Sequence, residues 1–320
     1  MPVLTFIESS NGKIKKNGFE LASYSCELAK LLDTDVVALT INVEDVNELS
    51  NYGIKKIIKV NNESLNKFSA SSFANIISKV ANQTNSNHLV LSSSLDSKYL
   101  APLLAAEINA AYVNNVIGLP TNLDPFTVKR TAFTNKAFSD SSVISDKIII
   151  GLSNNSFGLV ENSVDSIIEN LSIDVQSSDL TVDSSEKVSG QISIADADIV
   201  VSAGRGMKGP ENWNLIEDLA DTLGAATACS KPVSDMGWRP HSEHVGQTGK
   251  PVATNLYIAI GISGAIQHLA GINSSKVKVV INNDPEAPFF KAADYGVVGD
   301  AFDVVPRLNE KLKEFKAQNS

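Results

Sequence analysis

The segment Ile199-Val200-Val201-Ser202-Ala203-Gly204-Arg205-Gly206-Met207-Lys208-Gly209 decides the fold of the second half of the chain. A short apolar strand runs directly into glycines that match G-x-G-x-x-G, and a helical pattern follows over residues 212–223, with Gly224 as its stop. This succession is typical of a strand, a glycine-rich turn and a helix in an α/β fold. We therefore predict a sheet whose ligand site lies beyond the carboxyl ends of its strands.

The segments on either side extend this sheet. Further strands are predicted at 225–229, 256–260, 277–281 and 295–298, with helices at 265–269 and 305–315. Five buried strands with helices on both faces make a doubly wound parallel sheet.

The first half of the chain alternates strands and helices as well. Strands are predicted at 3–7, 36–41, 57–60, 88–92 and 147–152, with a helix at 20–32, and this alternation favours parallel pairing. The stretch 111–146 is rich in Asn, Thr and Ser and predicts an antiparallel excursion or long loops. A polar stretch at 172–197 is the predicted linker, so we divide the chain into domains 1–190 and 191–320.

Length and charge limit the function. The 320 residues suit two domains of ~150 residues each. A formal net charge of -9 provides no uniform positive field, which argues against nucleic acid as a partner. No apolar run approaches the ~20 residues of a membrane helix, and a strand-like segment opens the chain, so we expect an unprocessed cytoplasmic protein that is not membrane-embedded. Cys26 and Cys229 are too few for a disulfide framework.

Two glycine-rich junctions carry the candidate chemistry. Arg205, between two glycines, favours an anion contact, although the glycines could serve only a tight turn. A conventional NAD site is disfavoured because the next strand ends in Ser230 and Lys231 rather than in an acid. The second junction, 261–268, begins another helix, and backbone N–H groups there suit a pyrophosphate. Two such junctions in one sheet suggest a single ligand that spans both.

Several polar residues remain ambiguous when they are taken singly. Ser263 could be a hydrolase nucleophile, but its surroundings lack the final glycine of G-x-S-x-G. His268 is either a histidine at the edge of the core or a contact to a polar ligand. The segment 241–244 contains two histidines without further spaced metal ligands, so we expect a solvated loop there and no metal site. Gln247 and Thr248 could hydrogen-bond a heteroaromatic edge or form a simple turn.

Taken together, these segments strongly resemble the alpha subunit of electron-transfer flavoprotein. The resemblance lies in residues 204–206, 229–232, 245–250, 256–268 and 281–288, in order and spacing, with looser agreement at 99–106 and 130–137. It implies a nucleotide-hydrolase-like N-terminal α/β domain that packs with a beta subunit, and a C-terminal domain that holds non-covalent FAD. The family's AMP belongs to the beta subunit.

The resemblance also implies a function and a site. Members of the family carry electrons from flavin dehydrogenases, typically acyl-CoA dehydrogenases, to electron-transfer flavoprotein quinone oxidoreductase, and they transform no substrate of their own. No catalytic residue is therefore expected. The residues expected to line the FAD are Arg205, Ser230, Lys231, Val245, Gly246, Gln247, Thr248, Ser263, Gly264, Ala265, Ile266, Gln267, His268, Asn282, Asp300 and Ala301.

The expected roles within this set follow the residue types. Backbone N–H groups of residues 263–266 suit the pyrophosphate, and Asn282 and Asp300 suit the adenosine end. Thr248 is expected at the flavin N5 edge, and His268, as a cation or a donor, near the N1/O2 edge, where reduction places negative charge. Lys231 stands where the family has arginine. Lysine keeps the charge but lacks the planar fork, so altered flavin potentials are expected.

Three other functions remain open at this point. The chain could belong to an electron-bifurcating flavoprotein coupled to NADH oxidation, with a second FAD in the beta subunit. It could be another FAD-dependent oxidoreductase, or a protein that binds only an adenine nucleotide. The strand that begins at Val3 favours a bacterial cytoplasm over an organelle, because it leaves no room for a transit peptide.

Overall fold

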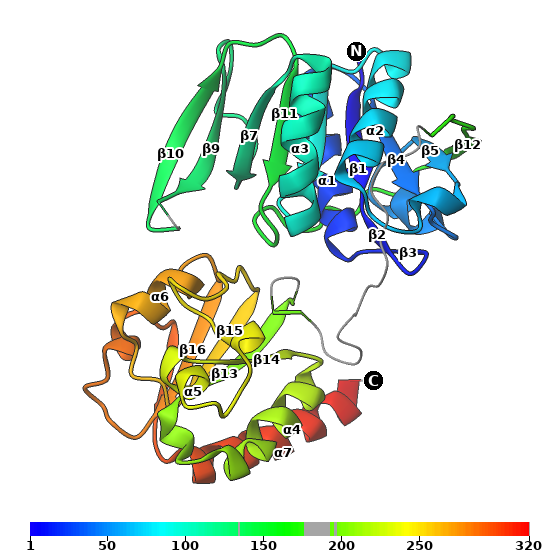
Figure 1. The fold of residues 1–320 in the computed structure, drawn as a ribbon. Helices are drawn as coiled ribbons and strands as arrows, with labels where there is room; N and C mark the ends of the chain where they lie inside the picture. The colour runs from blue at the N-terminus through cyan, green and yellow to red at the C-terminus, as the bar shows by residue number, and fades with distance from the viewer. Residues whose placement is uncertain (134, 176–192, 195–196, 320) are drawn as a thin grey trace. The chain divides into compact units, whose positions relative to one another are not determined.

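The computed structural model describes residues 1–133, 135–175, 193–194 and 197–319, which form two compact units (Figure 1). The first unit holds β1 to β12 and the second holds β13 to α7. Most of the predicted linker and the predicted boundary at residue 190 lie outside the described residues, so the boundary stays a prediction. Ile173 and Val175, at the start of the predicted linker, pack against the core of the first unit.

The first unit is built on a mixed sheet. Its strands are β1 (Val3–Ile7), β4 (Val36–Ile41), β5 (Lys56–Val60), β6 (His88–Ser92), β7 (Ala111–Val116), β8 (Asn122–Leu123), β9 (Phe126–Ala132), β10 (Ala137–Val143), β11 (Ile148–Leu152) and β12 (Ile167–Asn170). The described strands are ordered β10-β9-β7-β11-β6-β1-β4-β5-β12, with β8 beside β9. The strands from β7 through β11, β6, β1, β4 and β5 to β12 pair in parallel. β7 pairs antiparallel with β9, which confirms the predicted excursion.

Helices cover both faces of this sheet. Residues of α1 (Asn17–Leu31) share one apolar core with the sheet, and residues of α2 (Ala70–Thr84) and α3 (Leu95–Ile108) share the other. This two-sided cover explains why β1, β4 and β11 are buried along their whole length and are apolar except for Thr5 and Thr40. The short hairpin β2 (Ser9–Ser10) and β3 (Lys13–Ile14) and the 3-10 turns Asn47–Asn51 and Glu63–Leu65 connect these elements.

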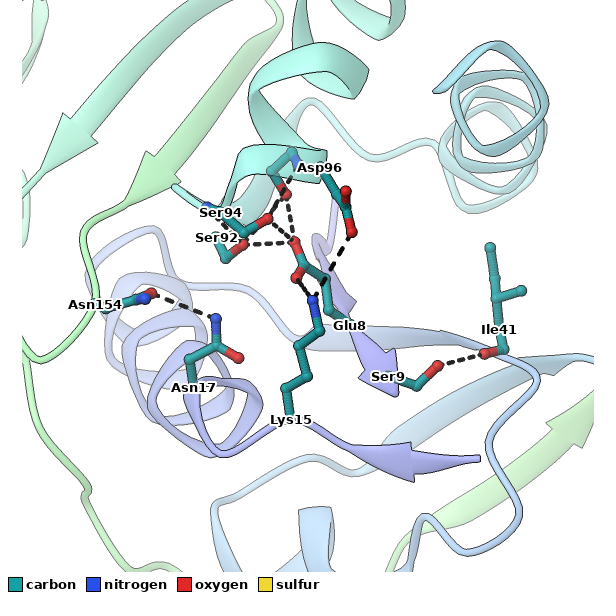
Figure 2. Close-up of polar contacts among 10 residues, drawn as sticks. Glu8, Ser9, Lys15, Asn17, Ile41, Ser92, Ser94, Asp96 and Asn154 are labelled. Atoms are coloured by element: carbon teal, nitrogen blue, oxygen red, sulfur yellow. Dashed lines mark hydrogen bonds and ion pairs between the residues drawn. The ribbon is translucent and has the colours of Figure 1, made fainter. Parts of the chain in front are cut away.

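A buried carboxylate occupies the carboxyl ends of β1 and β6 (Figure 2). Oε1 of Glu8 accepts hydrogen bonds from the hydroxyls of Ser92, Ser94 and Ser97 at 2.6, 2.5 and 2.6 Å, and Oε2 accepts one from Lys15 Nζ at 2.8 Å. Burial alone would raise the pKa of Glu8, but Lys15 and the hydroxyls together lower it. An ionised side chain of the protein thus fills the place where such sheets commonly bind ligands.

The second unit is a parallel sheet of five strands in the described part of the chain. The order is β14 (Ala226–Cys229), β13 (Ile199–Ala203), β15 (Leu256–Ile260), β16 (Val277–Asn282) and β17 (Tyr295–Val298). α4 (Asn214–Leu223) and α7 (Ala301–Asn319) pack on one face, and α6 (Ile266–Ile272) packs on the other. The short helix α5 (Lys231–Asp235) follows β14. The predicted doubly wound architecture is confirmed.

One part of that prediction is wrong, because the fifth strand is not buried. All four residues of β17 are exposed, with Tyr295 at 67%. β17 is the edge strand and pairs only with β16 among the described strands. Its apolar composition resembles that of the buried strands, so its position at the edge is a property of the tertiary structure.

Candidate functional site

A pocket of about 550 Å³ lies at the carboxyl ends of the second sheet, where the doubly wound fold predicts a ligand. It is lined by Gly204, Arg205, Gly206, Ser230, Lys231, Pro232, His244, Val245, Gly246, Gln247, Thr248, Gly261, Ile262, Ser263, Ala265, Gln267, His268, Asn282, Asp284 and Ala287. These residues follow four neighbouring strands, β14, β13, β15 and β16, along the same edge of the sheet.

The two glycine-rich junctions touch each other across this edge. β13 and β15 are neighbours, and the Gly206 N–H donates to the carbonyl of Gly261 at 3.1 Å. A Cβ on Gly206 would lie 2.6 Å from the Gly261 Cα, and Gly261 itself has a φ of +59°. Side chains are therefore excluded at both positions by backbone contact. The first junction continues as 3-10 turns at Arg205–Met207 and Pro210–Asn212 before α4 begins, unlike a conventional dinucleotide turn.

The loop that carries Gln247 and Thr248 is held at both ends. The Val245 N–H donates to the Cys229 carbonyl at 3.0 Å, and the Gln247 N–H donates to the Gln267 carbonyl at 2.7 Å. The loop is thereby attached to β14 on one side and to α6 on the other. Its exposed Gln247 and Thr248 side chains belong to the lining of the pocket.

The segment that precedes this loop contains a buried ion pair that the sequence did not predict. Arg239 donates to both carboxylate oxygens of Glu243, at 2.8 and 2.6 Å, and to Glu217 on α4 at 2.9 Å. Glu243 and His244 are buried, whereas His241 and Ser242 are exposed. The expectation of a solvated loop is therefore wrong for Glu243 and His244, because Arg239 supplies the partner that lets the carboxylate leave water. The signal for this ion pair in the sequence is an arginine and a glutamate four residues apart.

His268 is buried against the pocket as a neutral side chain. Its Nε2 lies 3.0 Å from the hydroxyl of Tyr257, and its Nδ1 has no hydrogen-bond partner among the described residues. Burial and, to a lesser extent, nearby His244 lower the pKa of His268 to about 4, against a smaller opposing effect of a weak hydrogen bond with the Val245 backbone. His268 is therefore uncharged at neutral pH in the protein itself, and its expected role as a cation or a donor toward the flavin stays a prediction.

Twelve of the sixteen predicted residues line the pocket. They are Arg205, Ser230, Lys231, Val245, Gly246, Gln247, Thr248, Ser263, Ala265, Gln267, His268 and Asn282. Lining residues that the prediction did not include are Gly204, Gly206, Pro232, His244, Gly261, Ile262, Asp284 and Ala287. Gly204, Gly206 and Gly261 belong to the predicted glycine-rich junctions, whereas the prediction for His244 is a solvated loop.

The other four predicted residues, Gly264, Ile266, Asp300 and Ala301, lie outside this lining. Asp300 accepts a hydrogen bond from the Phe302 N–H at 2.9 Å at the start of α7, and its carboxylate lies 3.7 Å from Lys208 Nζ. Asn282 lines the pocket, but its amide already bridges two backbone groups, the Ile262 carbonyl at 3.0 Å and the Asp284 N–H at 3.0 Å.

The charges around the pocket favour an anionic ligand. Arg205 and Lys231 are exposed at its lining, and the lining residues include one carboxylate, that of Asp284. The part of the chain that the structure describes has no group of three or more His, Cys, Asp or Glu side chains that could hold a metal ion. None of its helices has the length and apolar character needed to span a bilayer.

A pocket at strand ends, with glycine backbone, two cations and a buried imidazole nitrogen that has no hydrogen-bond partner among the described residues, defines a nucleotide-cofactor-binding protein of the doubly wound α/β class. A family model described as electron transfer flavoprotein FAD-binding domain matches residues 193–273, and one described as electron transfer flavoprotein domain matches residues 3–172. The chain belongs to the electron transfer flavoprotein alpha subunit family. Its cofactor is FAD, and the residues of the pocket fit that group.

Relatives match most or nearly all of the chain. Electron transfer flavoprotein subunit alpha of Bacillus subtilis (strain 168) is 33% identical over 318 residues, which covers 98% of this chain and 97% of the relative. The mitochondrial electron transfer flavoprotein subunit alpha of Dictyostelium discoideum is 35% identical over 280 residues, 82% of this chain and 78% of the relative. Protein FixB of Clostridium saccharobutylicum is 29% identical over 323 residues, 98% of this chain and 96% of the relative.

Proposed function

We propose that this chain is the FAD-carrying subunit of a heterodimeric electron carrier. It shuttles single electrons from flavin dehydrogenases, typically acyl-CoA dehydrogenases, to a membrane quinone oxidoreductase, and it transforms no substrate of its own. The observation that carries the proposal is the strand-end pocket of the second unit, in which the buried His268 Nδ1 has no partner among the described residues. FAD, when bound, supplies a centre that takes up and releases electrons one at a time.

The residues of the pocket divide this task by their chemistry. Arg205 and the backbone N–H groups that precede α6 would hold the pyrophosphate, because the first turn of a helix has N–H groups without intrahelical acceptors. Lys231 would supply a positive charge to the isoalloxazine, and Thr248 would hydrogen-bond its N5 edge. His268 would donate from Nδ1 to the N1/O2 edge, where reduction places negative charge, and so would favour the reduced cofactor.

A beta subunit is the proposed obligate partner, with AMP bound in that partner. The names of the relatives support a second subunit, since they call those proteins subunit alpha of an electron transfer flavoprotein. The cytoplasm of a bacterium stays the predicted location, and the relatives come from bacteria and from mitochondria.

The test is co-expression of this chain with the beta-type subunit, followed by absorbance spectroscopy and chromatography of the released nucleotides. One FAD and one AMP per heterodimer is the expected result. Two FAD molecules would instead support a bifurcating flavoprotein coupled to NADH oxidation. A colourless complex without flavin would refute the proposal.

A matched pair of variants tests the site itself. Lys231→Ala removes a cation of the lining, whereas Lys250→Ala removes an exposed cation that follows the same loop but lies outside the lining. We expect FAD to dissociate faster from Lys231→Ala and at the unchanged rate from Lys250→Ala, as measured by the loss of flavin absorbance on dilution and filtration. Equal retention in the two variants would contradict the assignment of Lys231.

A further inference from the structure

A tyrosine outside the pocket holds the histidine that lines it. Tyr257 lies on β15 and is completely buried, and it is absent from the lining of the pocket. Its hydroxyl lies 3.0 Å from Nε2 of His268. The Ser202 hydroxyl lies beside the phenol, but it has no hydrogen bond of acceptable geometry. Among the described residues, Nε2 is thus the acceptor available to Tyr257.

The direction of this hydrogen bond follows from the protonation of both groups. Burial raises the pKa of Tyr257, so the phenol keeps its proton, and burial holds the pKa of His268 near 4, so the imidazole is neutral at pH 7. A buried hydroxyl needs an acceptor, and Nε2 is the one at hand. In a neutral imidazole one nitrogen accepts and the other carries the proton. The proton of His268 therefore lies on Nδ1.

The reverse arrangement leaves more groups unsatisfied. If Nε2 carried the proton and donated to Tyr257, the phenol O–H would have no acceptor of good geometry among the described residues. Nδ1 would then be a buried acceptor without a donor among the described residues. Both consequences cost free energy in a buried site.

We propose that Tyr257 is a positioning residue whose hydroxyl holds His268 as the Nδ1–H tautomer, so that the pocket offers the flavin a neutral N–H donor. Tyr257 acts through His268 and does not itself belong to the lining of the pocket. The inference rests on the proposed function only where it names the flavin N1/O2 edge as the acceptor. The tautomer itself is a property of this chain.

The wild-type tautomer is the primary test. The full chain, in complex with the beta subunit, is labelled with ¹⁵N-histidine, and its four histidines are distinguished by a His268→Gln variant. We expect the long-range ¹H–¹⁵N spectrum at pH 7 to show His268 protonated on Nδ1 and bare on Nε2, with and without FAD. Protonation on Nε2, or on both nitrogens, would overturn the proposal without any need for a Tyr257 variant.

Two tyrosine variants then separate positioning from stability. Tyr257→Phe removes the donor to Nε2, and Tyr24→Phe removes an equally buried hydroxyl in the first unit, one that donates to the Gly118 carbonyl at 3.2 Å. We expect Tyr257→Phe to shift the tautomer ratio of His268 by roughly five- to tenfold, the effect of one hydrogen bond. Its first one-electron flavin potential falls as well, and Tyr24→Phe changes neither quantity.

The outcomes separate this inference from the proposed function. An unchanged tautomer ratio or an unchanged potential in Tyr257→Phe would overturn the role of Tyr257, even with FAD fully bound. A complex that binds no FAD but shows the Nδ1–H tautomer would refute the proposed function and support the tautomer.

Discussion

Arg239→Ala tests the ion pair that holds the loop before the pocket. The variant leaves the Glu243 carboxylate, whose side chain is 6% exposed, without its bidentate partner. Loss of one member of a buried pair costs about 3–5 kcal/mol. The second unit has about 140 residues, and with ~2.1 cal/mol/K per residue for the entropy of unfolding this cost lowers its Tm by about 10–17 °C.

Tryptophan fluorescence is the assay, because it reports on the second unit alone. The two tryptophans of the chain, Trp213 and Trp238, both belong to this unit. Lys311→Ala is the control: it removes an exposed pair with Glu314 on α7 and should leave the Tm unchanged. Arg239→Ala combined with Glu243→Gln should recover part of the lost Tm, because the double variant no longer buries an uncompensated charge.

Two results would refute this reasoning. A fall in Tm of less than about 3 °C, equivalent to ~1 kcal/mol, would mean that the buried pair contributes no more than an exposed one. A double variant as unstable as Arg239→Ala alone would mean that the loss comes from the packing of Arg239 against Trp213, whose ring lies 5.7 Å from the guanidinium carbon.

Three further predictions concern pH and the cofactor. Because burial lowers the pKa of His268 to about 4, below about pH 6.5 the unfolded chain binds a proton that the folded unit does not bind, and the free energy of unfolding falls by about 3 kcal/mol between pH 6.5 and pH 4. In urea titrations followed by fluorescence, His268→Gln should reduce this pH-dependent loss of stability. An equally steep loss in the variant would contradict the prediction. Glu8 has a lowered pKa, so the stability that its charge contributes is present above about pH 4.5 and is lost as the pH falls through the folded-state pKa. We expect Glu8→Gln to lower the Tm of the first unit, measured by circular dichroism, at pH 7 but not in strong acid. An equal loss at both pH values would argue against the charge as the cause. Lys231→Arg should raise the first one-electron potential of bound FAD in potentiometric titration, because the planar fork of arginine stabilises added charge better; an unchanged or lowered potential would disprove this role.

Much of the fold was predictable because its signals are local. The predicted strand at 256–260 coincides with β15, and the predicted strand at 295–298 coincides with β17. Short β-branched runs bounded by glycine and polar residues require no knowledge of distant neighbours. The place of the site was also predictable, since the carboxyl ends of parallel strands share one edge of the sheet.

The sequence by itself thus determined two α/β units, a doubly wound second sheet, and a pocket beside the glycine junctions. Only the tertiary structure decided that β17 is exposed at the edge, that Arg239 pairs with the buried Glu243, and that His268 is buried with a lowered pKa beside the hydroxyl of Tyr257. The physical reason is that burial and protonation depend on which distant residues surround a side chain. Strand and turn formation depend mainly on residues that are adjacent in the chain.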